Sequence, residues 1–212
     1  DWHSIMFPFG RPFGEKRLQA FDRIAHCHQS VEIEPLDRGK RLDAETLKRL
    51  GEWGRYVDVD GDGIAYRSVP GDGMPAYFNR GSGHNTRGQY SERPDDYRNN
   101  LDRLARKFET ARQWVPREAV DVDPEAEIAL IAYGSSHWAV EEARDQLRDE
   151  AGVRTSYMRL RAYPFTTEVE RFIGRHARAY VVEQNRDAQM LSLLKLDLTS
   201  GQVGKLRSVL CY

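Results

Sequence analysis

Short apolar runs alternate with amphipathic segments through the second half of the chain, and this alternation restricts the fold more than any other feature. Residues 127–133 are mostly apolar, as expected of a strand buried on both faces. The same periodicity predicts strands at 153–160, 177–183 and 206–212, with helices at 137–151, 167–175 and 187–197. Strands and helices that alternate at this spacing imply crossover connections. The fold class is therefore α/β, with an open parallel sheet.

Polar residues mark the starts of the predicted helices in this half. A serine at 135 or 136 precedes the first helix, and Gly152 ends it. Thr167 and Glu170 have the spacing of a capping box at the second helix. Asp187 is the predicted cap of the third. Local sequence thus offers an explanation for each helix start.

The first half of the chain is rich in glycine, proline and aromatic residues, and it contains only two helical patterns. One begins at Asp43 and places Leu47, Leu50 and Trp53 on a narrow apolar stripe. The other begins at Asp95 or Asp96 and continues until Pro116. Its apolar residues at helical spacing are Tyr97, Leu101, Leu104, Phe108 and Ala111.

Residues 58–92 lie between these two helices and are dense with glycine. A loop of this length is uncommon in a compact domain and is usually functional, disordered or packed on another body. Aromatic residues argue against disorder because they can bury surface. We therefore assign residues 1–118 to an irregular extension or linker that packs on a neighbouring domain, and residues 119–212 to the α/β domain.

The overall composition excludes several classes of protein. Lys and Arg number 32 against 33 Asp and Glu, so the formal net charge of −1 gives no bulk attraction for nucleic acid. No apolar run approaches the ~20 residues that cross a bilayer, so we expect no membrane segment. Cys27 and Cys211 are the only cysteines, which excludes a disulfide framework and favours a reducing, cytoplasmic setting. Because the chain begins at Asp1, we expect it to be a piece of something longer.

Two short motifs could suggest a metal. Residues 26–28 read His-Cys-His, but three adjacent ligands cannot all face one ion, so we interpret this motif as coincidence. Residues 58–63 match the opening of a calcium loop, although the acid required at its twelfth position is replaced by Val69. The alternative is that these acids accept backbone hydrogen bonds in turns or pair with Arg55 and Arg67. The candidate metal ligands are Asp58, Asp60 and Asp62.

A third motif at residues 80–85 places two glycines around a serine, between an arginine and a histidine. Glycines let the backbone approach a ligand closely, and the two flanking side chains supply a carboxylate-binding fork and a titratable donor. The alternative is an ordinary turn with a surface arginine. The candidate substrate- or interface-binding residues are Arg80, Gly81, Gly83, His84 and Asn85.

Two further segments follow predicted strands at one edge of the sheet. Open α/β sheets bind ligands at the carboxyl ends of their strands, and helix N-termini attract anions. Simple helix capping explains the serines equally well. The candidate crevice residues are Gly134, Ser135, Ser136, Glu183 and Asn185.

Several motifs, in the same order and at plausible spacing, resemble the α subunit of 2-oxoacid:ferredoxin oxidoreductases, the 2-oxoglutarate type being the nearest. In the first half these are residues 35–40 and 54–64, Tyr66-Arg67, Pro70-Gly71, Tyr77-Phe78, Arg80-Gly81 and Gly83-His84. In the second half they are residues 132–135, Glu142-Ala143, residues 181–187 and Gln189. The likeness covers most of the chain from about residue 35.

The resemblance implies that the chain is the C-terminal portion of a larger α subunit, with a transketolase C-terminal-like domain at residues 119–212. In that family an N-terminal pyrimidine domain and a β subunit hold thiamin diphosphate, Mg²⁺ and an iron–sulfur cluster. The assembly oxidatively decarboxylates a 2-oxoacid, transfers the acyl group to coenzyme A and reduces ferredoxin. This chain lacks the tyrosine–proline–isoleucine–threonine–proline motif and any cysteine set for a cluster. We therefore expect it to bind none of these cofactors and to be inactive alone.

One position departs from the family pattern. Asn85 and Thr86 stand where the family usually carries an acidic pair, which favours hydrogen bonding over acid–base chemistry in this loop. A competing hypothesis is a non-catalytic α/β scaffold used for docking. A calcium-binding extracellular module is disfavoured by Val69 and the free cysteines.

Overall fold

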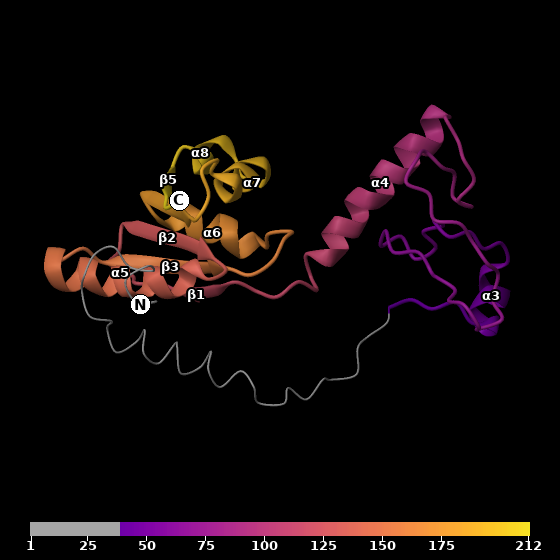
Figure 1. Ribbon diagram of the computed structural model, residues 1–212, viewed down its shortest axis with the longest axis horizontal. Helices are drawn as coiled ribbons and strands as arrows, with labels where there is room; N and C mark the ends of the chain where they lie inside the picture. Colours follow the sequence, from indigo (N-terminus) through magenta and orange to yellow (C-terminus); the bar gives the residue numbers. More distant parts are fainter. Residues whose placement is uncertain (1–38) are drawn as a thin grey trace, which may run out of the picture. The chain divides into compact units, whose positions relative to one another are not determined.

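The computed structural model describes residues 39–212, which divide into one unit at 39–115 and a second at 116–212 (Figure 1). The motif at residues 26–28 and the start of the 35–40 segment lie outside the described residues. Within the described part, no helix is both long and apolar enough to cross a bilayer.

The second unit is built on a five-stranded sheet in the order β1-β3-β2-β4-β5. Its parallel strands are β2 (Ile128–Tyr133), β3 (Thr155–Leu160), β4 (Arg178–Glu183) and β5 (Leu206–Leu210). The predicted open parallel sheet is confirmed. Strand β1 (Ala119–Asp121) pairs antiparallel with β3 at one edge. The sequence does not predict β1, because a three-residue exposed strand carries no apolar pattern.

Helices cover both faces of this sheet (Figure 1). Helix α5 (Ser136–Ala151) lies on one face, where Val140 packs with Leu130 and Tyr157. Helices α6 (Thr167–Arg175) and α7 (Gln189–Asp197) cover the other face, with the short α8 (Ser200–Val203) beside α6. Because side chains alternate along a strand, β2 supplies both cores. The fully buried residues of the larger core include Ile131, Met158, Val169, Phe172, Ile173, Val181 and Leu194.

Two helix starts differ in detail from those that the sequence predicts. The hydroxyl of Thr166 accepts from the backbone N–H of Glu168 at 3.2 Å and caps α6. The predicted capping box at Thr167 and Glu170 is therefore wrong by one residue. Ser135 occupies the cap position of α5, as predicted, but its side chain makes no capping hydrogen bond.

The start of α7 is held by Glu183 and not by the predicted Asp187. The Glu183 carboxylate accepts from the backbone N–H of Met190 at 2.7 Å and of Leu191 at 3.0 Å. Asn185 Oδ1 accepts from Gln189 N–H at 3.2 Å. The capping carboxylate comes from the end of the preceding strand, where its charge complements the positive end of the helix.

The first unit contains two helices, as predicted, but their ends differ. Asp43 Oδ1 accepts from Thr46 N–H at 2.7 Å and caps α3 (Ala44–Leu50). That helix ends before Trp53, which therefore does not continue its stripe. Helix α4 (Pro94–Ala111) begins at a proline and ends well before Pro116.

Helix α4 directs polar side chains toward the glycine-rich segment of its own unit. Asn100 Nδ2 donates to His84 O at 2.6 Å, and Thr110 Oγ1 donates to Asp62 O at 2.7 Å. The helix leaves exposed an apolar stripe, which we define as Tyr97 (62% exposed), Leu101 (48%), Leu104 (38%) and Phe108 (51%). An amphipathic helix normally buries its apolar face. In α4 a polar face makes the contacts within the unit instead.

Candidate functional site

The aspartate loop at residues 58–63 is neutralised largely by a lysine from outside it. Lys40 Nζ lies 2.7 Å from Asp60 Oδ2 and 2.6 Å from Asp62 Oδ2. The hydrogen bond from Lys40 lowers the pKa of Asp60 below its usual value. Asp62 Oδ1 also accepts from Ile64 N–H at 2.9 Å, as expected of an Asx turn.

The third acid of this loop fixes it to α4. Asp58 Oδ1 accepts from Gly63 N–H at 3.0 Å, and Asp58 Oδ2 lies 3.1 Å from Arg106 Nε. The backbone hydrogen bonds to Asp58 and Asp62 agree with the predicted turns, and the ion pairs described for this loop are to Lys40 and Arg106. Within residues 39–212, no group of three or more His, Cys, Asp and Glu side chains is arranged to hold a metal ion.

The loop at residues 80–85 is closed by its own hydrogen bonds. Asn85 Oδ1 accepts from the backbone N–H groups of Arg87 at 3.0 Å and Gln89 at 3.1 Å. A Cβ atom on Gly83 would lie 2.6 Å from Ser91 O, so only glycine fits there. The local structure therefore explains why residue 85 is an asparagine and residue 83 is a glycine.

Arg80 and His84 occupy different environments in this loop. The His84 ring stacks on Tyr56, with ring centroids 4.0 Å apart. Arg80 is exposed and its Nε donates to Gly88 O at 3.2 Å. No carboxylate of the described residues pairs with Arg80. Its guanidinium therefore retains donors for a ligand or a neighbouring protein surface.

A pocket of about 460 Å³ lies beside the same loop. Two tyrosine rings, Tyr90 and Tyr97, line it together with loop residues Ser82 and Gly83. Tyr97 also belongs to the apolar stripe of α4. The pocket is therefore lined by two exposed tyrosines and by loop residues that follow the exposed Arg80 in the sequence.

At the carboxyl edge of the sheet, the side of β2 that faces β4 is closed by side chains. Asn185 Nδ2 donates to Tyr133 Oη at 3.4 Å and to Glu183 Oε2 at 2.8 Å. Glu183 is fully buried and Ser136 nearly so, whereas Gly134 and Ser135 are exposed. The structure thus gives Glu183 and Asn185 a capping role at α7.

The side of β2 that faces β3 is open, and it holds a pocket of about 360 Å³. Gly134 of the predicted edge lines it, together with Arg159 and Arg161. Neither arginine was predicted from the sequence. For Arg159 the strand alternation was a signal, because it puts this residue on the same face as Tyr157.

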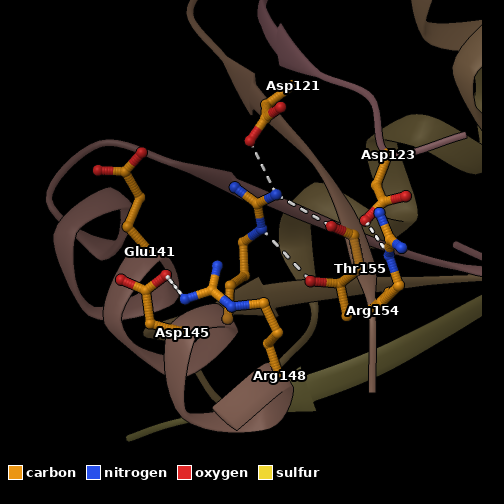
Figure 2. A pocket seen from close by; sticks show the side chains of 8 residues that line it. Asp121, Asp123, Glu141, Asp145, Arg148, Arg154 and Thr155 are labelled. Atoms are coloured by element: carbon orange, nitrogen blue, oxygen red, sulfur yellow. Dashed lines mark hydrogen bonds and ion pairs between the residues drawn. The ribbon is translucent and has the colours of Figure 1, made fainter. Parts of the chain in front are cut away.

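A third pocket, of about 160 Å³, is surrounded by alternating arginines and acids (Figure 2). Arg144 Nη2 lies 2.8 Å from Asp121, and Arg154 Nε lies 2.6 Å from Asp123. Arg148 Nη2 lies 3.0 Å from Asp145 Oδ1. Each arginine here is neutralised by a carboxylate. We interpret this cluster as a surface ion-pair network that links β1, α5 and β3.

Comparison with known proteins gives the chain a relative. The α subunit of 2-oxoacid:ferredoxin oxidoreductase 2 from Aeropyrum pernix is 32% identical to it over 166 residues. This chain is related to part of a 2-oxoacid:ferredoxin oxidoreductase α subunit. The match covers 76% of this chain but only 25% of the relative, so the chain spans about a quarter of that α subunit. No family model matches the sequence.

The fold agrees with this relationship. A solved 2-oxoglutarate:ferredoxin oxidoreductase from Magnetococcus marinus, with 2-oxoglutarate, coenzyme A and succinyl-CoA bound, superposes with a TM-score of 0.69. The superposition covers 85% of this chain and 30% of that chain, at 19% identity. At 19% identity, this structural similarity is evidence for the fold only. The 2-oxoglutarate type therefore stays a prediction.

Proposed function

We propose that this chain forms the C-terminal part of the α subunit of a 2-oxoacid:ferredoxin oxidoreductase and is not catalytic by itself. The observation that carries the proposal is the 32% identity over 166 residues to a named α subunit. The complete enzyme would oxidatively decarboxylate a 2-oxoacid, form acyl-coenzyme A and reduce ferredoxin. Thiamin diphosphate, Mg²⁺ and the iron–sulfur cluster would be held by the rest of the α subunit and by the β subunit.

Within that assembly, we propose that the first unit serves as a docking element. The apolar stripe of α4 is exposed in water, at a cost that a covering protein surface would remove. The contacts of α4 within its own unit use polar side chains, so covering the stripe would not disturb them.

Reconstitution tests this function directly. The 212-residue chain is co-expressed with the remaining α-subunit region and the β subunit, and 2-oxoacid-dependent ferredoxin reduction is measured. We expect activity and coenzyme A dependence only when all parts are present. Equal activity without this chain, or no complex with the other parts, would contradict the proposal.

The apolar stripe gives a prediction about assembly. Leu101→Gln combined with Leu104→Gln should leave the melting temperature within a few degrees, because both side chains are exposed. The same change should weaken assembly about tenfold or more, since buried apolar anchors dominate interface energy. Asp102→Asn, which is exposed on the same helix, is the matched control. Affinity capture of the co-expressed subunits measures the effect, and equal recovery of all variants would assign the stripe no role in docking.

A second prediction concerns the Arg80 loop. We propose that Arg80 binds a carboxylate of the substrate or of a neighbouring subunit. Arg80→Ala should then cost about 1.5–3 kcal/mol in the affected step, or roughly ten- to a hundredfold in rate. The melting temperature should barely change, because Arg80 is exposed and the hydrogen bond described for its side chain goes to a backbone carbonyl.

Arg87→Ala, two residues after the end of this loop, is the matched control. Its guanidinium pairs with Glu52 at an exposed position, which contributes little to stability. Steady-state kinetics of the assembled enzyme are compared with melting curves of the same preparations. Unchanged kinetics for Arg80→Ala, or a rate loss that follows a collapse in melting temperature, would leave Arg80 as an ordinary turn residue.

A further inference from the structure

The pocket at the carboxyl ends of β2 and β3 is lined by two arginines and, among the described residues, by no acidic residue. Arg159 lies on β3, two residues after Tyr157 and on the same face, and Arg161 follows the end of the strand at Leu160. Tyr157 packs in the core beneath α5, so Arg159 lies on the face of the sheet that α5 covers, and Arg161 lines the same pocket. Gly134, Ala119 and Leu160 also line it.

Neither arginine is neutralised by a carboxylate of the described residues. Arg159 Nη2 donates to Gly134 O at 3.4 Å, and Arg161 Nη1 donates to Arg117 O at 3.4 Å. Both contacts are long and go to neutral carbonyl groups. By contrast, the three arginines of the cluster in Figure 2 are each paired with an aspartate. The second unit thus pairs one group of arginines with aspartates and leaves the two arginines at this pocket without a carboxylate partner among the described residues.

The first turn of α5 adds to the positive potential at this edge. Gly134 connects β2 to this helix, and Ser135 gives it no side-chain cap. The backbone N–H groups of its first turn therefore lack that acceptor, and the helix dipole points its positive end to the same edge. The N-terminus of α5 therefore adds to the positive charge that the two arginines bring to the pocket.

We propose that the pocket binds a phosphate group of a small soluble ligand, held by Arg159 and Arg161. A phosphate group has enough oxygens to accept from two guanidinium groups at once, whereas a single carboxylate is satisfied by one fork. The volume of about 360 Å³ suits a small ligand. The pocket is distinct from the Arg80 loop, and the proposal does not depend on the role of that loop.

Calorimetric titration of the 212-residue chain at constant ionic strength tests the proposal. Inorganic phosphate and pyrophosphate serve as probes, and acetate serves as the carboxylate probe. We expect both phosphate probes to bind, pyrophosphate more tightly, and acetate to bind at least about tenfold more weakly than pyrophosphate. In amide NMR spectra, the signals of residues 135–138 should shift with pyrophosphate.

Substitutions assign the binding to this pocket. Arg159→Gln and Arg161→Gln should each weaken pyrophosphate binding about tenfold or more, and Arg159→Lys should restore part of it by keeping the charge. Arg178→Gln is the matched control, because Arg178 is an exposed arginine at the amino end of β4, the opposite edge of the sheet. It should change the affinity less than about twofold.

Three results would overturn the proposal: no binding of either phosphate probe at millimolar concentration, acetate binding as tight as pyrophosphate binding, or pyrophosphate affinity unchanged in both glutamine variants. Melting curves of all variants show whether the fold is retained. Arg161 is exposed, so Arg161→Gln keeps the test decisive even if Arg159→Gln destabilises the sheet.

Discussion

Replacing Glu183 with alanine should lower the stability of the second unit by about 3 kcal/mol or more. The side chain is fully buried, and its carboxylate accepts from Asn185 Nδ2 and from the backbone N–H groups of Met190 and Leu191. Alanine removes the acceptor and leaves the buried N–H of Leu191 and the partly buried N–H of Met190 without it. Two of them belong to the first turn of α7, so that turn should loosen first.

The measurement is the melting temperature together with hydrogen exchange of the backbone amides. For a unit of this size, a loss of about 3 kcal/mol corresponds to a fall of roughly 12 °C or more. Exchange should accelerate at residues 183–197, with residues 94–111 of the first unit as an internal reference. Glu183→Gln is the matched control, because it keeps one oxygen in nearly the same place and should cost less than alanine. An alanine variant as stable as the parent chain would show that the Glu183 cap is not needed.

Replacing Gly63 with alanine should disrupt the packing of the aspartate loop against α4. Gly63 has a φ of +79°, and a Cβ atom there would lie 2.3 Å from Lys107 N and 2.6 Å from Arg103 O. These are backbone atoms of a helix, so they cannot move aside as a flexible side chain would. We expect a loss of about 3 kcal/mol or more in the first unit, since steric overlap adds to backbone strain.

Gly61 provides a control in the same loop. Its φ is +75°, but a Cβ atom there would meet no atom within 4 Å. Gly61→Ala therefore carries the strain without the overlap and should cost about 1 kcal/mol. Urea unfolding followed by amide exchange at residues 94–111 separates the two effects. Equal losses in the two variants would mean that the close approach to α4 does not determine stability.

The sheet could be predicted because its signals are local. The apolar run in β2 indicates a buried strand whatever surrounds it, and Gly152 ends α5 through its own left-handed backbone. The start of α7 could not be predicted in this way. Its cap is a carboxylate from the preceding strand, and only the folded sheet brings Glu183 to the helix.

The loops also contain some features that the local sequence encodes and others that depend on the folded structure. Glycine spacing was enough to single out the Arg80 loop, because turn geometry is encoded in neighbouring residues. The cation that neutralises Asp60 and Asp62 is Lys40, about twenty residues away, and nothing in the local sequence identifies it. Arg159 and Arg161 were missed because a pocket is a property of several strands. Periodicity found the apolar stripe of α4, but it could not indicate that a polar face would make the contacts within the unit.

That orientation of α4 has a consequence for the supply of the protein in a cell. If the stripe docks as proposed, a copy made in excess of its partner would keep large apolar side chains in water, and such surfaces are what chaperones and proteases recognise. A copy that finds its partner would hide them. The helix would then match the amount of surviving chain to the amount of partner, by shortening the lifetime of every unassembled copy.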